Sequence, residues 1–405
     1  MSSVCIAFAN GCPRSRMETA KLFSYFEQNG WEIKEKIEKA DIVLVSTCGV
    51  NETSEKKSVS LISIADKKRK KDSQLVILGC LAGINEEQLK EQFQATLIPP
   101  AKIDNIDSAI GAAIKLKQIK EPNQIGDNFL KAQRCFSIFA RLCSEFRPSR
   151  EFFYRLASVA LPHKSWQIIQ EPYQHDVFGI RVAKGCNQEC SYCAVRLAEG
   201  PLHSKPLAEV MAEFKTGVWD GFRIFTLVAG DLGAYGQDIG TDIVELLSSI
   251  FQYKEDFKLH LKDFSPRWLV CYSPRLTVLL SQNSNRVGNF MLPIQSGSET
   301  ILLAMKRGYT AADAKTCLCE LHNACSGIIL STHVIVGFPG ETDHDFQDTI
   351  DLLNAVRFDR IDIYKYSDRP QTESSVMPDK VVEKVKRKRV RQLRREFRGV
   401  AELAC

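Results

Sequence analysis

The first hundred residues alternate between short apolar runs and longer amphipathic stretches. Apolar runs at 4–10, 41–47 and 74–79 predict strands, and the apolar spacing of 16–30 predicts a helix that ends at Gly30. Strands that are separated by helices form right-handed βαβ units with parallel strands. We therefore predict an N-terminal domain built on a parallel βα sheet.

The same alternation returns about six times between residues 177 and 366. The predicted strands lie at 177–183, 222–230, 257–263, 287–294, 328–337 and 361–367. Helical spacing between them is found at 205–219, 299–306, 310–323 and 343–356. Six βα units are too few to close a ring of eight, so we predict a partial (β/α)6 barrel and an α/β fold class for the whole chain.

Two segments do not share this alternation. Residues 128–170 are aromatic and basic and read as helical, either as a cap over apolar surface or as a substrate-recognition element. Residues 380–398 form a basic amphipathic helix, either packed on the barrel with a solvated face or contacting nucleic acid. The expected domains are an N-terminal domain at 1–100, a linker with the insert at 101–175, the partial barrel at 176–375 and the basic C-terminal helix at 376–405.

Composition narrows the class of protein. A length of 405 residues suits two or three domains, and 44% hydrophobic with 25% charged residues is typical of soluble globular chains. A net charge of +5 is too small to indicate nucleic-acid binding by itself. With no apolar run long enough to span a membrane and no signal-peptide pattern, we expect a cytoplasmic protein that does not bind membranes. Fourteen cysteines in that compartment indicate metal or cluster ligation rather than disulfides.

Three cysteines, Cys186, Cys190 and Cys193, form a C-x3-C-x2-C triplet directly after the first strand of the second domain. Three thiolates on one short loop can hold three irons of a [4Fe–4S] cluster and leave the fourth iron open to chelate S-adenosylmethionine (SAM). Zinc is the alternative, but it prefers four ligands and no nearby cysteine or histidine completes a tetrahedron. The spacing therefore favours an iron–sulfur cluster.

Cys12, Cys48 and Cys80 are far apart in sequence, yet each follows one predicted strand of the first domain and each has a neighbouring glycine. The carboxyl ends of parallel strands line one edge of a sheet, so these three thiols are expected to converge there. The alternative is that they are buried cysteines that act as small apolar residues. Their equivalent positions favour a second, auxiliary [4Fe–4S] cluster.

The chain resembles the radical SAM methylthiotransferases over essentially residues 4–390. The matching segments are NGCPRSRMET, ADIVLVSTCGVNETSEKKS, VILGCLAG, KGCNQECSYCAV, AGDLGAYGQD, LPIQSGSETILLAMKRGYT, VIVGFPGETDHDFQDT and YSDRPQTESSVMP. The resemblance implies an N-terminal methylthiotransferase domain, a radical SAM partial barrel, and conversion of C–H to C–S–CH3. It also implies two [4Fe–4S] clusters, SAM as methyl donor and radical source, a sulfur source, and a low-potential electron donor such as flavodoxin or ferredoxin.

The resemblance also implies where SAM binds. Its contacts are expected after the barrel strands, at Tyr192, Gly230, Asp231, Arg267, Gln295, Gly337 and Glu341. For Asp231 the alternative is that it caps a turn, and turn formation likewise explains Gly340 beside Glu341.

Two departures from the family pattern bear on the substrate. The first is the stretch after the third cysteine of the triplet, which is arginine-rich in the family and reads AVRLAEGPLHSK here, with Glu199, His203 and Lys205 in place of arginines. The second is that we expect no C-terminal TRAM domain after the basic helix. We therefore favour a peptide, protein or natural-product precursor, or another small molecule, as the substrate. A tRNA adenosine is the second hypothesis, and a non-catalytic iron–sulfur scaffold is the third.

Overall fold

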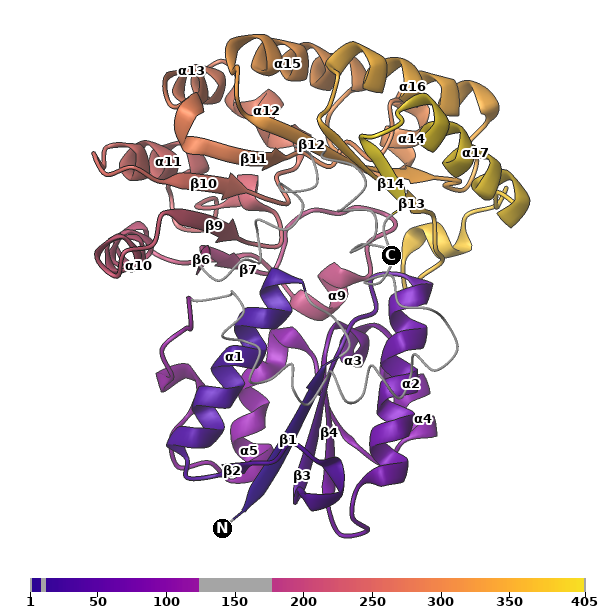
Figure 1. Cartoon of the computed structure of the whole chain (residues 1–405). Coiled ribbons are helices and arrows are strands. Elements are labelled where there is room, and N and C mark those ends of the chain that lie inside the picture. Colours follow the sequence, from indigo (N-terminus) through magenta and orange to yellow (C-terminus); the bar gives the residue numbers. More distant parts are fainter. Residues whose placement is uncertain (1, 9–11, 124–176, 404–405) are drawn as a thin grey trace, which may run out of the picture. The chain divides into compact units, whose positions relative to one another are not determined.

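The computed structural model describes residues 2–8, 12–123 and 177–403. The chain divides into two compact units, Met1–Val177 and Phe178–Cys405, and each is built around its own sheet (Figure 1). The aromatic and basic insert expected at 128–170 lies outside the described residues. Its interpretation as a cap or a recognition element stays a prediction.

The first unit contains a five-stranded sheet in the order β2-β1-β3-β4-β5, and every pair of neighbouring strands is parallel. The strands are β1 (Ser3–Phe8), β2 (Glu32–Ile33), β3 (Ile42–Thr47), β4 (Gln74–Gly79) and β5 (Thr96–Ile98). The three predicted strands and the predicted parallel sheet are confirmed. The edge strands β2 and β5 were not predicted, because two or three residues are too short to show an alternation.

Helices cover both faces of this sheet. They are α1 (Pro13–Gln28), α2 (Glu52–Lys68), α3 (Cys80–Ile84), α4 (Glu86–Gln92) and α5 (Ile106–Ile110). Alternate strand residues point to opposite faces: Ile6 and Leu44 pack in one apolar cluster with α1 and α5, while Ala7 and Val45 pack in the other with α2, α3 and α4. In Figure 1, α1 and α2 accordingly lie on opposite sides of the strands.

The first unit continues beyond residue 100. Ile103 and Ile106 belong to the same apolar cluster as α1, and the Tyr25 hydroxyl donates a hydrogen bond of 2.7 Å to Asp107. Asn29 bonds both the carbonyl and the N–H of Ile114. Residues that were expected in the linker at 101–175 therefore form part of the first unit's core.

The second unit contains a seven-stranded sheet in the order β14-β13-β12-β11-β10-β9-β6, and the recorded pairings from β9 to β14 are parallel. The strands are β6 (Val177–Arg181), β9 (Ile224–Val228), β10 (Lys258–Leu261), β11 (Val287–Met291), β12 (Ile329–Val336), β13 (Arg360–Lys365) and β14 (Ala401–Leu403). All six predicted strands and the partial-barrel fold class are confirmed. The seventh strand, β14, was missed because it contains only three residues.

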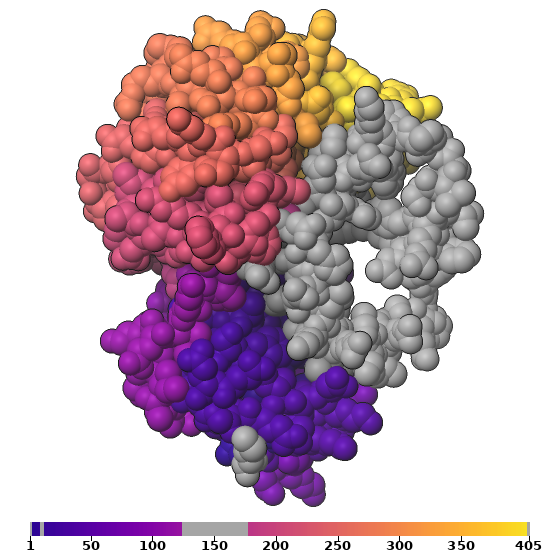
Figure 2. Space-filling view, turned by 60° about the vertical axis from the view of Figure 1, so that its left-hand side comes forward, coloured from indigo at the N-terminus to yellow at the C-terminus, as the bar shows by residue number. Residues whose placement is uncertain are grey.

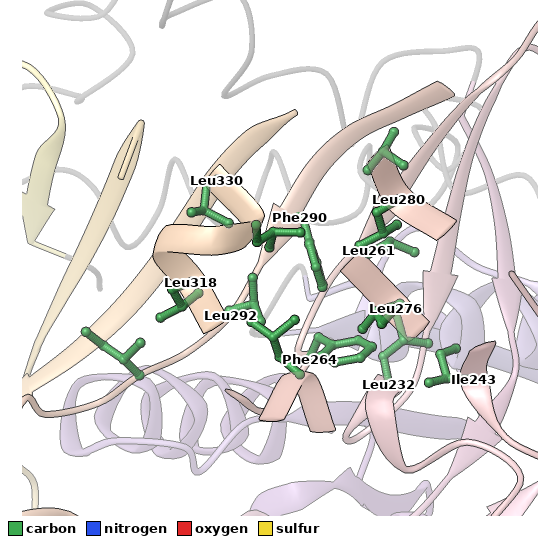
Figure 3. Close-up of a cluster of buried hydrophobic side chains, with 14 of the residues drawn as sticks. Leu232, Ile243, Leu261, Phe264, Leu276, Leu280, Phe290, Leu292, Leu318 and Leu330 are labelled. Atoms are coloured by element: carbon green, nitrogen blue, oxygen red, sulfur yellow. The ribbon is translucent and has the colours of Figure 1, made fainter. Parts of the chain in front are cut away.

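The helices of the second unit pack on one face of its sheet. The longer ones are α10 (Leu207–Trp219), α11 (Ile243–Phe251), α12 (Pro266–Tyr272), α13 (Arg275–Gln282), α14 (Glu299–Ala304), α15 (Ala311–Ala324), α16 (Asp343–Val356) and α17 (Glu383–Glu396). Figure 3 shows the core between sheet and helices, where Leu261 and Phe290 from the strands lie near Leu276 of α13. The rings of Phe264 and Phe290 meet edge to face, with centroids 5.1 Å apart.

The opposite face of these strands carries polar side chains. His260 of β10 is buried and its Nδ1 accepts the N–H of Asn289 at 3.0 Å, and the Ser331 hydroxyl donates to the Asn289 side-chain oxygen at 2.6 Å. Burial lowers the pKa of His260 to about 4, so the ring is neutral at pH 7 and acts as an acceptor. The sheet is thus apolar toward its helices and polar on the other side.

The basic helix α17 packs on the sheet of the second unit. Val390 and Leu393 enter the apolar core, and the buried Arg389 forms ion pairs with Glu341 and, at 2.9 Å, with Asp343. Six cations on its other face are exposed: Lys384, Arg387, Lys388, Arg391, Arg394 and Arg395. Part of the yellow C-terminal segment, to which α17 belongs, lies at the surface in Figure 2. The structure therefore shows the packed helix of the first interpretation, and α17 connects β13 to β14. No helix among the described ranges is long and apolar enough to cross a membrane.

Gly79 at the end of β4 provides a test of how closely β3 and β4 pack. Its φ of 97° and ψ of −172° lie in a region that only glycine adopts readily, and a Cβ there would stand 2.3 Å from the Thr47 carbonyl oxygen. We predict that Gly79→Ala lowers the free energy of unfolding by about 3 kcal/mol or more. Urea unfolding of the purified protein measures this loss.

Gly30→Ala is the matched control. Gly30 also has a positive φ, of 75°, but a Cβ there would meet nothing within 4 Å. Its cost should be limited to the left-handed backbone, about 1 kcal/mol. Equal losses in the two variants would show that the contact with Thr47 does not matter.

Candidate functional site

The first cysteine set lies at the carboxyl edge of the first sheet. Thr47 of β3 pairs with Gly79 of β4. Cys48 directly follows Thr47 and Cys80 directly follows Gly79, so the two cysteines come at the same level of neighbouring strands. Cys12 follows β1, whose Phe8 pairs with Ser46. The three cysteines therefore stand at the same end of three adjacent strands, as the strand pattern predicts.

Neighbouring hydroxyl groups fix two of these cysteines. The Cys12 Sγ accepts the N–H of Ser15 at 3.4 Å as the N-cap of α1, and the Ser15 hydroxyl lies 3.4 Å from that of Ser46 at the end of β3. The N–H of Cys48 donates to the Ser58 hydroxyl at 2.9 Å, and the same hydroxyl donates to the Cys48 carbonyl at 2.8 Å. Cys12 and Cys80 are partly exposed residues, whereas Cys48 is buried.

The second cysteine set lies on the loop between β7 (Ala183–Lys184) and α9 (Val195–Glu199) of the second unit. Burial, and to a smaller extent the charges of Asp231, Cys193 and Cys190, raises the pKa of the Cys186 thiol to about 12, although the N–H of Gln188 acts to lower it. A bound metal cation would lower the pKa of this thiol instead, because coordination keeps a thiol deprotonated.

Each cysteine set supplies three thiols, the ligand type and number that a [4Fe–4S] cluster with one open iron takes. Within the described parts of the chain, no three cysteine, histidine or acidic side chains are gathered as a site for a single metal ion. The role of both sets as cluster ligands stays a prediction.

Glycines let the cysteine loop approach the end of β9. A Cβ at Gly230 would stand 2.4 Å from the Gly185 carbonyl oxygen, and a Cβ at Gly185 would stand 1.8 Å from that of Pro201. Gly185 also has a φ of 72°. The predicted residue Gly230 is therefore adjacent to Cys186, where only a hydrogen fits.

Asp231 links that loop to the next connection of the barrel. Its carboxylate is buried and accepts hydrogen bonds from Gln188 Nε2 at 2.8 Å, Trp268 Nε1 at 2.7 Å and the N–H of Ser265 at 3.2 Å. Burial raises the pKa of Asp231, whereas these donors and Arg307 act to lower it. Both oxygens thus bond groups of the protein itself, although the side chain makes no capping bond to the turn that it begins. A contact of Asp231 with SAM stays a prediction.

Gln295 has the features of a ligand contact. Its backbone has a φ of 68°, rare for a residue other than glycine, while its N–H and carbonyl bond the His333 carbonyl and the Ile335 N–H. The side-chain Oε1 is buried and has no hydrogen-bond partner. A buried acceptor without a donor is costly, so a bound group that donates a hydrogen bond would stabilise this position.

The other expected SAM contacts differ in their surroundings. Arg267 is exposed, with its guanidinium 5.3 Å from the centre of the Trp268 ring. Glu341 is buried, accepts the N–H of Gly337 and is paired with Arg389, and burial raises its pKa to about 7. Gly337 faces the Lys386 side chain. Glu341 and Gly337 therefore contact α17, and their role toward SAM stays a prediction.

Tyr192 and Arg307 complete the surroundings of the cysteine loop. The Tyr192 ring packs edge to face on Phe338 with centroids 6.5 Å apart. The Tyr192 hydroxyl accepts a hydrogen bond from Arg307 at 3.3 Å, and Arg307 also donates to the Cys190 Sγ at 3.2 Å. Sequence reasoning missed Arg307, because it is 117 residues from Cys190 and carries no recognisable spacing.

Two family models match the chain. One, described as "Uncharacterized protein family UPF0004", covers residues 5–98, and the other, the radical SAM superfamily, covers residues 180–353. The first range contains Cys12, Cys48 and Cys80, and the second contains the loop triplet.

Curated relatives match nearly the whole chain. Ribosomal protein uS12 methylthiotransferase RimO of Protochlamydia amoebophila is 25% identical, over 95% of this chain and 74% of the relative. The tRNA-2-methylthio-N(6)-dimethylallyladenosine synthase of Methylacidiphilum infernorum is 27% identical, over 93% and 76%. Threonylcarbamoyladenosine tRNA methylthiotransferase MtaB of Thermotoga maritima is 27% identical, over 96% and 81%.

A solved structure has the same fold. The radical S-adenosylmethionine methyltransferase TsrM of Kitasatospora setae, with cobalamin and a [4Fe–4S] cluster bound, superposes with a TM-score of 0.59. The match covers 93% of this chain and 77% of TsrM at 16% identity, so the likeness concerns the fold.

The hydrogen bonds of Asp231 generate a test of how the cysteine loop is held. In Asp231→Asn, one acceptor oxygen becomes an NH2 that faces either the Gln188 and Trp268 donors or the N–H of Ser265, so at least one buried donor would lose its acceptor. We predict a loss of about 2 to 3 kcal/mol in the free energy of unfolding. Thermal unfolding of the metal-free protein measures it.

Asp238→Asn is the control, because Asp238 follows the same strand, is exposed and accepts from the N–H of Ser204. That variant should lose no more than about 1 kcal/mol. A loss from Asp231→Asn that is no larger would mean that Asp231 does not anchor the loop.

Proposed function

We propose that this chain, which belongs to the radical SAM methylthiotransferase family, converts a C–H bond of a protein or peptide to C–S–CH3. Enzymes of this family use SAM and two [4Fe–4S] clusters. The observation that carries the proposal is the presence of two separate thiol sets, one at the carboxyl ends of three strands of the first sheet and one on the loop between β7 and α9. A binding scaffold that uses a single cluster would not need both.

We assign the auxiliary cluster to Cys12, Cys48 and Cys80 and the SAM-binding cluster to the triplet Cys186, Cys190 and Cys193. When bound, the clusters and SAM supply the radical that removes the substrate hydrogen and the methylated sulfur that replaces it. The protein positions the reactants and excludes water from the site. Asp231 and Gly230 fix the cysteine loop against the barrel, and the orphan oxygen of Gln295 is a candidate contact for SAM or substrate.

A protein or peptide substrate is supported by the stretch that follows the triplet. His203 and Lys205 are the basic residues that stand in place of the family's arginines. Lys205 pairs with Glu213 at 2.5 Å and is largely buried. Glu199 adds a negative charge just before Gly200. Such a stretch is a weak contact for phosphate groups, and the relative from P. amoebophila is named for a ribosomal protein.

A tRNA substrate is the second candidate, and the outer face of α17 favours it. The exposed cations of α17 at 384, 388, 391 and 395 recur every three or four residues and so form one stripe along the helix. Such a stripe can follow a phosphate backbone. Two of the relatives are named for tRNA products or substrates.

The cluster assignment predicts how iron divides between the two cysteine sets. The reconstituted protein should hold about eight irons, four in each cluster. Replacing Cys186, Cys190 and Cys193 by alanine should remove about half of that iron and all reductive cleavage of SAM to 5′-deoxyadenosine. Replacing Cys12, Cys48 and Cys80 should also remove about half, but it should keep SAM cleavage and abolish methylthio transfer.

Iron analysis and chromatography of 5′-deoxyadenosine give these readouts. Cys271, Cys317 and Cys319 lie on α12 and α15 and belong to neither set, so their joint replacement by alanine is the matched control and should keep all the iron. Loss of SAM cleavage in both test variants, with folding preserved, would contradict the separate roles.

The substrate class is tested by incubating the enzyme with mixtures of candidate substrates. The reconstituted enzyme, with SAM and dithionite, is incubated separately with ribosomal proteins, with tRNA and with low-mass metabolites. Mass spectrometry should find the added methylthio mass in a polypeptide, with a rate that changes little with salt. Efficient modification of tRNA alone, weakening steeply as salt rises, would replace this proposal by the second candidate.

A further inference from the structure

Arg307 is a buried cation beside a proposed cluster ligand. Its side chain is 5% exposed and lies in the second unit, in the turn that follows α14. Nη1 donates to the Cys190 Sγ at 3.2 Å and to the Tyr192 hydroxyl at 3.3 Å. A buried guanidinium is costly to desolvate, so its retention at this place needs a compensating interaction.

The backbone is shaped to direct this side chain inward. The residues on either side, Lys306 and Gly308, both have positive φ values, 55° and 69°. The N–H of Arg307 bonds the Leu302 carbonyl at 3.1 Å and so closes the end of α14. Two left-handed residues in a tight turn therefore place the guanidinium under the cysteine loop rather than in solvent.

The second arm of the guanidinium binds the barrel. Nη2 donates to the Pro293 carbonyl at 2.9 Å, after β11, and to the Ser265 hydroxyl at 3.3 Å, before α12. Asp231 is the carboxylate near enough for Arg307 to affect its pKa. Asp231 is itself shared among three other donors, so it does not form a direct ion pair with Arg307.

We infer that Arg307 is a positioning residue that holds Cys190 and places a fixed positive charge beside the SAM-binding [4Fe–4S] cluster. This inference rests on the proposed function, because it takes Cys190 as a ligand. Reduction adds one electron to the cluster and leaves it more negative by one charge. A nearby cation and an N–H donated to a ligand sulfur both stabilise the reduced form, so they raise the midpoint potential.

The charge and the shape of Arg307 can be separated by substitution. Arg307→Met is neutral and of similar length, and a buried ion replaced by such a side chain often leaves a protein folded. Arg307→Gln is a second neutral variant with a polar end. Arg307→Lys keeps the positive charge but loses the two-armed geometry.

The experiment measures the midpoint potential of the SAM-binding cluster alone. Each variant is made in the full chain that carries Cys12, Cys48 and Cys80 as alanine, is reconstituted with iron and sulfide, and is titrated with dithionite while the reduced cluster is followed by electron paramagnetic resonance. Both neutral variants should shift the potential to more negative values, whereas Arg307→Lys should stay close to the parent. Iron content and thermal unfolding are recorded for every protein.

Lys306→Gln is the matched control, since it removes the neighbouring cation, which is exposed and paired with Glu373. It should leave the potential unchanged. Neutral variants with full iron and the parent's potential would overturn the inference, as would a shift in Arg307→Lys as large as in Arg307→Met. A parent that binds no cluster would instead refute the cysteine assignment on which the proposed function rests.

Discussion

Parallel strand pairing is the constraint that gathers the first thiol set and brings the connections of the barrel together around the loop of the second. Because all strands of a parallel sheet end at the same edge, residues that are distant in sequence meet there without any local motif. The register of Thr47 with Gly79 sets Cys48 and Cys80 side by side, and Gly79 permits that register because its backbone adopts a conformation closed to other residues. The first thiol set is therefore a product of sheet geometry, whereas the second is a product of one short loop.

The loop needs more support than its own sequence gives. Glycines at 185 and 230 bring it against the barrel, and Asp231 and Arg307 then tie it to the connections after β10 and β11. Buried charges of this kind are costly when left unpaired, so each is surrounded by donors or acceptors. The result is a rigid frame for three thiols, which is what a cluster that must keep one iron open requires.

Sequence patterns predicted the elements and the places of the cysteines better than the supporting contacts. The strands of four or more residues were found, and β2, β5 and β14 were missed because they are too short for a periodic signal. The convergence of Cys12, Cys48 and Cys80 at one sheet edge was predicted because strand ends are visible in sequence, and their role as cluster ligands stays a prediction. The contact of Arg307 with Cys190 was not predicted, because only the tertiary fold brings the two together. Glu341 was named as a SAM contact, but its ion pair with Arg389, 48 residues away, was likewise not predicted.

The central claim is that this chain holds one [4Fe–4S] cluster on each of its two cysteine sets. A crystal structure of the anaerobically reconstituted protein, with anomalous data collected at the iron absorption edge, tests it most directly. The account predicts two compact groups of iron peaks, one beside Cys12, Cys48 and Cys80 and one beside Cys186, Cys190 and Cys193. Iron beside only one set, or a single ion in place of a cluster at either, would contradict it.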